Sequence, residues 1–320
     1  MYVDTNGSLP TILERTQSLP LPPSIDPFYT APDDYQSAKP GEILRIRIAP
    51  GNLTSIISNS SKAYNILFRT TDTHHRPSWA VTTLFTPANS PNNLSLPAHG
   101  ANQALLSYQI AYDSANLDSS PSYSFQPSNV LAEIPDMLGR GIWVNIPDYE
   151  GPLAPLGAGA QSSHATLDSI RAVLSSNLGL LPNTRSAMWG YSGGALASGW
   201  AAELQADYAP ELKISRVVLG GTPSNIRSVL GAVDGKIFAG LIPNAILGLS
   251  TQHRAFHDLL YTNTKTEGSF NRTSLLAFRT LSLNESLAGF AFHNISDYLL
   301  HGQADLEAPE IRQAFASEAS

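Results

Sequence analysis

Hydrophobic and polar residues follow a period of two in the first part of the chain, as half-buried β-strands require. Residues 43–48 read Ile-Leu-Arg-Ile-Arg-Ile, and residues 65–71 and 80–87 are runs of β-branched and aromatic residues bounded by turn residues. Such segments place one face in the core and the other toward solvent. They predict an antiparallel start to a sheet. Residues 1–40 are too rich in proline for long regular elements, so we expect an irregular N-terminal wrap there.

The pattern changes near residue 105, where short apolar runs alternate with loops and one clear helix. The expected strands are residues 105–110, 141–146, 186–189 and 216–220. Between the second and third of them we expect a helix that Ser163 caps and Gly179 ends. Its apolar face carries Leu167, Ile170, Val173, Leu174 and Leu178. Alternation of strand, loop and helix predicts a parallel sheet with crossover helices.

A Gly-Tyr-Ser-Gly-Gly sequence, residues 190–194, follows the expected strand at 186–189 and precedes helix-forming residues without proline up to Pro210. The pattern G-x-S-x-G arises often by chance, so this strand-to-helix context is what makes it informative. Small residues let strand and helix approach, and the sharp turn then holds a serine hydroxyl clear of its neighbours. We interpret the stretch as a nucleophile elbow with Ser192 as nucleophile. The alternative is an accidental turn serine.

Beyond residue 221 the alternation stops. Residues 223–320 read as short helices and loops with apolar clusters at 237–242 and 287–292. We therefore expect three parts: the wrap at 1–40, an α/β core at 41–222, and a helical lid or cap at 223–320. A lid over an apolar pocket and a plain helical cap both fit this pattern.

Composition narrows the possible partners. The net charge is −7, and the chain has 19 Lys and Arg residues without a basic run. This distribution does not predict a positively charged surface for binding nucleic acid. The chain has no cysteine, and its eight histidines lack the spacing of metal ligands, so no metal or other cofactor is expected. The adjacent His74 and His75 are interpreted as part of a solvated turn. No apolar run reaches the length of a transmembrane segment.

Several long stretches resemble the fungal secretory lipases, the lipase-A-like branch of the α/β-hydrolases. They are residues 106–114, 145–152, 157–171, 188–204 and 219–223. The resemblance implies an α/β-hydrolase fold with a mostly parallel sheet, flanking helices and a helical lid insertion. It implies that Ser192 is the nucleophile, that the Gly193 backbone N–H is one oxyanion-hole donor, and that Asp113 is the position of the other. For Asp113, a plain turn former before Ser114 remains the alternative.

The chain departs from the family pattern in two places. The cysteine that family members usually carry in the segment corresponding to residues 118–122 is absent. Family members also continue past the position of Ser320 into strands that carry the catalytic acid and histidine. We therefore expect a C-terminally truncated lipase, without the last strands of the sheet. In such a chain residues 216–220 would form an unpaired, apolar sheet edge.

The motif His301-Gly-Gln-Ala-Asp305 resembles an acid-bearing segment, but the hydrolase order is serine, acid, histidine, and no histidine follows Asp305. Asp297 and His301 are four residues apart, which favours a local hydrogen bond on one helical face. Asp234 or Asp258 with a later histidine satisfies the order but lacks a preceding strand. We expect the triad acid and histidine to be absent from this chain.

Two classes of function remain open. The first is a serine hydrolase that cleaves carboxylic esters such as triacylglycerols, at a lipid–water interface or as a carboxylesterase for small soluble esters. The second is a non-catalytic truncated chain or a lipid-binding pseudoenzyme. The resemblance implies an extracellular glycoprotein, although the N-terminal residues show no signal peptide. Seven N-x-S/T sequons begin at Asn6, Asn52, Asn59, Asn93, Asn271, Asn284 and Asn294.

Overall fold

A seven-stranded sheet forms the centre of the computed structural model, which describes residues 19–88, 103–124, 133–223 and 225–318. The strands are β1 (Ile43–Ile48), β2 (Ser60–Thr71), β3 (Pro77–Pro87), β4 (Ala104–Gln109), β5 (Trp143–Pro147), β6 (Arg185–Tyr191) and β7 (Ile214–Gly220). Each segment expected to be a strand is one, and β1 has the expected bounds. Residues 19–40 hold only two short 3-10 helices, Pro27–Tyr29 and Tyr35–Ser37, as an irregular wrap requires.

The strands lie in the order β1-β2-β3-β5-β4-β6-β7. The pairs from β1 to β5 are antiparallel, and β5, β4, β6 and β7 are mutually parallel. This confirms the antiparallel start and the parallel continuation. Because β4 lies between β5 and β6, the chain winds outward from β4 in both directions. Ligands of open α/β sheets bind at such a point, outside the carboxyl ends of the strands.

Two long helices, α4 (Gly159–Ser175) and α5 (Gly193–Tyr208), pack against each other and against the sheet. Shorter helices α1 (Leu53–Ile56), α2 (Pro121–Ser124) and α3 (Glu133–Gly139) complete the core. The prediction that Ser163 caps the first long helix is wrong, because α4 begins four residues earlier and Ser163 is buried inside it. A Cβ on Gly159 would lie 2.6 Å from Cδ1 of the Trp200 ring, so only a residue this small lets the helix start there.

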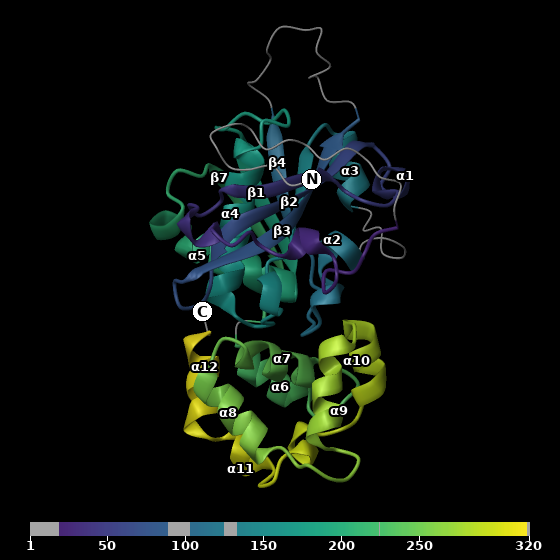
Figure 1. Cartoon of the computed structure of the whole chain (residues 1–320), viewed down its shortest axis with the longest axis vertical. Helices are drawn as coiled ribbons and strands as arrows, with labels where there is room; N and C mark the ends of the chain where they lie inside the picture. The colour runs from purple at the N-terminus through teal and green to yellow at the C-terminus, as the bar shows by residue number, and fades with distance from the viewer. Residues whose placement is uncertain (1–18, 89–102, 125–132, 224, 319–320) are drawn as a thin grey trace, which may run out of the picture.

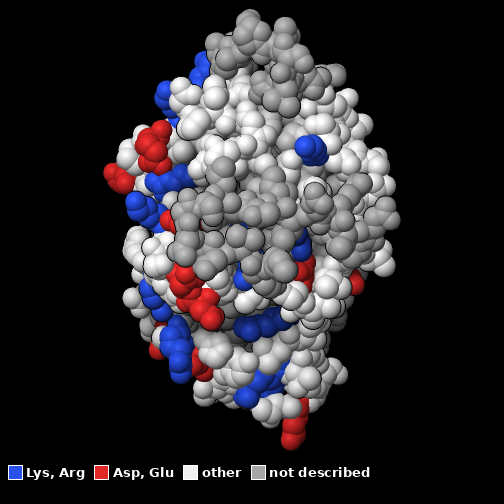
Figure 2. All heavy atoms as spheres, turned by 45° about the horizontal axis from the view of Figure 1, so that its top comes forward, with Lys and Arg blue, Asp and Glu red and all other residues white. Residues whose placement is uncertain are grey.

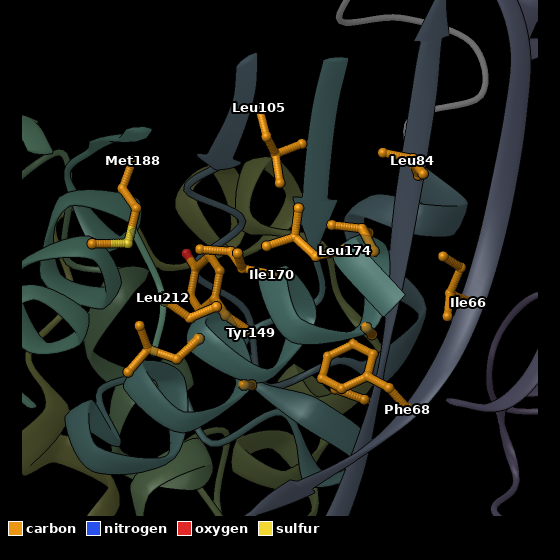
Figure 3. Close-up of a cluster of buried hydrophobic side chains, with 14 of the residues drawn as sticks. Ile66, Phe68, Leu84, Leu105, Tyr149, Ile170, Leu174, Met188 and Leu212 are labelled. Atoms are coloured by element: carbon orange, nitrogen blue, oxygen red, sulfur yellow. The ribbon is translucent and has the colours of Figure 1, made fainter. Parts of the chain in front are cut away.

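The main core fills the space between the sheet and the two long helices. Figure 3 shows part of it, with side chains from β2, β3, β4, α4 and β6 meeting around Ile170 and Leu174. A buried polar group lies in the same layer: Asp168 accepts hydrogen bonds from Thr70 Oγ1 at 2.8 Å and Tyr208 Oη at 2.7 Å, and pairs with Arg171 at 2.8 Å. This network ties β2, α4 and α5 together.

After β7 the structure changes to a layer of helices at one end of the sheet, coloured green to yellow in Figure 1. It comprises α6 (Ile226–Val233), α7 (Leu241–Ser250), α8 (Arg254–Asn263), α9 (Arg272–Leu276), α10 (Leu283–Phe290), α11 (Gln303–Leu306) and α12 (Pro309–Ser317). Within residues 225–318 the only β pairing is an isolated bridge between Thr264 and Leu299. Its helices share a buried apolar cluster, to which Ala115 and Ala158 of the core also contribute. Its action as a lid stays a prediction.

Two surface features bear on partners. In the described part of the chain β7 pairs only with β6, and Val218 and Leu219 on it are 51% and 43% exposed, so the expected apolar edge is present. Acidic and basic side chains lie among one another on the left and lower part of the face in Figure 2. None of the helices in the described ranges is both long enough and apolar enough to span a membrane.

Candidate active site

Ser192 lies at the turn between β6 and α5, where it is the N-cap residue of the helix. Its backbone has φ 53° and ψ −121°, a conformation that costs a non-glycine residue free energy and is found mainly at functional sites. Two backbone hydrogen bonds hold the turn: Ser192 N donates to Gly220 O at 2.9 Å, and Leu196 N donates to Ser192 O at 3.0 Å. The predicted strained strand-to-helix turn is confirmed.

Two glycines of the turn are required by close backbone approaches. A Cβ on Gly190 would lie 2.7 Å from the backbone nitrogen of Ala195, and one on Gly194 would lie 2.8 Å from the carbonyl carbon of Gln109. The helix therefore crosses both its own preceding strand and the end of β4 at backbone distance. Ser198 Oγ in α5 lies 2.7 Å from the side chain of Gln109, the last residue of β4. This contact also holds α5 against β4.

Asp113 follows β4 and reaches the first residue of α5. A Cβ on Gly193 would lie 2.9 Å from the carboxyl carbon of Asp113, so the carboxyl group lies against the Cα atom of Gly193. Asp113 has φ 40°, is 6% exposed, and its Oδ1 has no hydrogen-bond partner among the described residues. Burial raises the pKa of the Asp113 carboxyl to about 6. The structure thus brings Ser192, Gly193 and Asp113 together, and their catalytic roles remain predictions.

A second set of buried polar residues follows β5, and the sequence analysis did not assign it a role. Glu150 is fully buried, its backbone N–H donates to Tyr112 Oη at 2.7 Å, and neither of its carboxyl oxygens has a partner in the described structure. The Tyr112 and Tyr149 rings lie 5.0 Å apart. Burial raises the pKa of Glu150 well above its usual range, and the negative charges of Asp113 and Asp148 add to the effect. Two sequence signals pointed to it: its position just after an apolar strand and its place in the 145–152 stretch that resembles the secretory lipases.

Asp148 connects this set to the N-terminal wrap. It accepts hydrogen bonds from Ser122 N at 2.9 Å and Ser122 Oγ at 2.5 Å, and Ser122 Oγ lies 2.8 Å from Tyr29 Oη. Burial raises the pKa of Asp148 to about 7, against the opposing effect of the two hydrogen bonds from Ser122. The wrap therefore stabilises the loop that carries Glu150.

The helical layer is anchored beside Asp113. Ser114 Oγ donates to the carbonyl oxygen of Leu281 at 2.9 Å, and Ala115 N donates to Asn244 Oδ1 of α7 at 3.2 Å. A movement of these helices would therefore act on the loop that positions Asp113.

The histidines of the described chain lie elsewhere, and none of them forms a hydrogen bond with Ser192. His301 Nδ1 lies 3.0 Å from Asp305 Oδ1, and His301 N donates to Asp305 Oδ2 at 2.9 Å. The prediction of a local hydrogen bond between Asp297 and His301 is wrong, because the 3-10 helix that holds Asp297 ends at Tyr298 and His301 pairs with Asp305 instead. No group of three or more potential metal ligands gathers anywhere in the described ranges. The absence of the triad acid and histidine from the chain stays a prediction.

Comparison with known proteins places this geometry in a family. The family model described as secretory lipase matches residues 124–316. The trichothecene C-3 esterase of Fusarium sporotrichioides is 47% identical over 305 residues, covering 93% of this chain and 68% of that protein. Lipase 1 of Candida albicans is 44% identical over 254 residues, covering 75% of this chain and 52% of that lipase. The chain thus spans between about half and two thirds of the length of these relatives.

Comparison with solved structures supports the same family. Candida antarctica lipase A in its closed state superposes with a TM-score of 0.83 at 28% identity, covering 94% of this chain and 69% of that chain. The rice cell wall degrading esterase LipA from Xanthomonas oryzae has a TM-score of 0.65 at 15% identity, a likeness of fold alone. The chain has the α/β-hydrolase fold and belongs to the secretory lipase family.

Proposed function

We propose that this protein hydrolyses carboxylic esters through an acyl-enzyme on Ser192. The observation that carries the proposal is the strained turn at Ser192 with the Asp113 carboxyl against Gly193. In this mechanism Ser192 Oγ attacks the ester carbonyl, and the Gly193 backbone N–H and Asp113 supply the two donors to the oxyanion. The alcohol leaves, and water then releases the acid.

The reaction also needs a base for the Ser192 proton. The resemblance to the secretory lipases implies an acid and a histidine in strands past the position of Ser320, and we propose that turnover requires such a segment. Its strands would pair with the exposed edge of β7. The alternative is a non-catalytic chain that at most binds a lipid or acyl chain.

The substrates we propose are esters such as triacylglycerols, met at a lipid–water interface outside the cell. The relative named trichothecene C-3 esterase, at 47% identity, supports including the ester of a small soluble alcohol as a second substrate. Seven sequons are consistent with a secreted glycoprotein.

The test compares the 320-residue chain with a version extended through a downstream acid and histidine, each with and without Ser192→Ala. We expect p-nitrophenyl ester hydrolysis by the extended chain only, and its loss on Ser192→Ala. In subtilisin, removal of the serine or the histidine of the triad costs roughly 10⁶ in turnover. Ser192-dependent hydrolysis by the short chain would disprove the need for the segment. Hydrolysis by the extended chain that survives Ser192→Ala would disprove the function.

A further inference from the structure

Besides the edge of β7, the structure exposes a second group of large apolar side chains, on the helical layer. Ile237, Phe238 and Phe292 are 56%, 54% and 68% exposed. They are neighbours, because Phe292 N donates to the carbonyl oxygen of Lys236 at 2.9 Å, one residue before Ile237. Single exposed apolar residues are ordinary on protein surfaces, whereas a group of them in one place marks a binding surface. We call these three residues the apolar patch.

The segment that carries Ile237 and Phe238 is fixed on its inner side. Ala239, the next residue, is fully buried. A Cβ on Gly240 would lie 2.6 Å from the backbone nitrogen of Leu287, so the segment lies directly on α10. The small residues therefore pack inward, and the two large ones before them face solvent.

Phe292 is exposed at a cost to the backbone. Phe290, two residues earlier, is 1% exposed, and its ring centroid lies 5.6 Å from that of Phe278. Phe292 has φ 65°, a left-handed conformation that costs a bulky residue free energy. At 68% exposure its ring gains little packing from the protein in return. A contact outside the chain explains a phenylalanine at this position.

The charges around the apolar patch narrow the kind of partner. Residues 235–240 and 291–294 contain no acidic residue, although the net charge of the chain is −7, and they include the exposed Lys236. The preceding acid, Asp234, is turned to the backbone, where its Oδ1 accepts a hydrogen bond from Ile295 N at 3.0 Å. Apolar side chains beside a cation are the combination that binds a lipid surface, with the rings among acyl chains and the cation at the headgroups.

The apolar patch is also close to the helix that adjoins the candidate active site. Leu241 N, at the start of α7, donates to the carbonyl oxygen of Phe238 at 3.1 Å. In the next turn of α7, Asn244 Oδ1 accepts a hydrogen bond from Ala115 N at 3.2 Å, two residues after Asp113. Docking through the patch would therefore hold α7, and the loop that it contacts, at the docked surface.

We propose that Ile237, Phe238 and Phe292 dock this protein onto a lipid–water interface by inserting among the acyl chains. The proposal rests on the proposed function, in which such an interface holds the substrate. It assigns the docking to side chains of the helical layer that no step of the proposed hydrolysis uses.

The first test needs no activity. The 320-residue chain and the extended chain, both with Ser192→Ala, are produced in bacteria so that the Asn294 sequon beside the patch carries no glycan. Each is co-sedimented with phosphatidylcholine vesicles. We expect both chains to bind, and the pair Phe238→Ser and Phe292→Ser to weaken binding by about 100-fold, because two rings no longer bury apolar surface.

The matched control is Leu181→Ser, a change at a 41% exposed apolar residue in the loop before β6. This loop lies at the amino ends of the parallel strands, whereas the helical layer follows the carboxyl end of β7. We expect the control to bind vesicles as its parent does. No binding by either parent chain, or equal losses in the control and the double variant, would overturn the proposal.

Phe292→Gly separates docking from a structural role. Glycine adopts a φ of 65° without strain, so we expect the urea midpoint to stay the same or to rise. Vesicle binding should nevertheless fall by about tenfold. A lower midpoint with unchanged binding would assign Phe292 to the fold and contradict the proposal.

A second copy of the chain is the competing occupant of the apolar patch. Sedimentation equilibrium without lipid should give the same mass for the parent and for the double variant. A dimer that the double variant abolishes would replace the lipid surface as the partner.

The last test compares hydrolysis of a triacylglycerol emulsion with that of soluble p-nitrophenyl acetate by the extended chain with Ser192 intact. We expect the ratio of the two rates to fall in the double variant and to be retained in Leu181→Ser. Equal loss on both substrates would show that the patch acts on the active site and not on docking. If the extended chain hydrolyses neither ester, the proposed function fails, and the vesicle result still decides whether the patch binds lipid.

Discussion

Gly194→Ala should separate the helix of the candidate active site from the sheet. A Cβ at this position would lie 2.8 Å from the carbonyl carbon of Gln109, and ordinary contact begins at 3.4 Å, so the two backbones must part by at least 0.6 Å. The Gln109 carbonyl oxygen is closer still. Both atoms belong to the backbone, so no side-chain rotation relieves the overlap. Overpacking of this kind costs about 1–3 kcal/mol, and we expect the upper end because α5 and β4 must move as units.

Helix propensity acts in the opposite direction, since alanine is favoured over glycine by about 1 kcal/mol inside a helix. Gly231→Ala in α6 is the matched control, because a Cβ there would meet no atom within 4 Å. Urea unfolding followed by circular dichroism should show that Gly194→Ala lowers the free energy of unfolding and that Gly231→Ala raises it by about 0.5–1 kcal/mol. Equal stabilisation by both substitutions would refute the close approach of α5 to β4.

Three further predictions follow. Gly193→Ala should push the Asp113 carboxyl away, and we expect hydrolysis by the extended chain to fall by about 10²–10³, the typical loss of one oxyanion donor; unchanged kcat would contradict the placement of Asp113. Asp168→Ala should lower the free energy of unfolding, measured in urea, by about 1–3 kcal/mol, because Arg171 and Tyr208 lose one buried partner and keep Glu211 and Thr71; an unchanged free energy of unfolding would mean that the network is not stabilising. His301→Ala should change stability by less than about 1 kcal/mol, since the His301 side chain is largely exposed, and should leave hydrolysis intact. A loss of hydrolysis would show that the local motif is catalytic after all.

The strands and the nucleophile turn could be predicted because both leave local signals. β1 has the bounds of the sequence pattern, although its burial does not alternate, because Arg47 pairs with Asp26 of the N-terminal wrap. The turn at Ser192 is marked by glycines at which a larger residue would force the backbone to shift, since Gly190 and Gly194 meet backbone atoms of neighbouring elements. Where a local structural constraint dictates the residue type, the sequence alone predicts the local structure.

The start of α4 shows where local signals fail. Ser163 is a good N-cap residue by type, yet the helix extends past it to Gly159. The extension depends on the Trp200 ring of α5, which lies so close to Gly159 that a larger residue would not fit. Tertiary packing thus overrides capping preference, and the residue that overrides it belongs to a different helix.

Glu150 was missed by sequence reasoning, and the burial of the Asp113 carboxyl was not foreseen, for a different reason. Charged residues are almost never fully buried unless they are paired, so the residue type alone indicates an exposed carboxyl group for Glu150 and for Asp113. Their loops leave the sheet side by side because β5 pairs directly with β4, an order that alternating strand and helix patterns do not specify. Both residues break the rule of polar satisfaction at one place, on loops beside the strained serine. Natural sequences retain such conflicts chiefly where function requires them, which is why these two acids, and not the better-looking His301 and Asp305, are the residues to test.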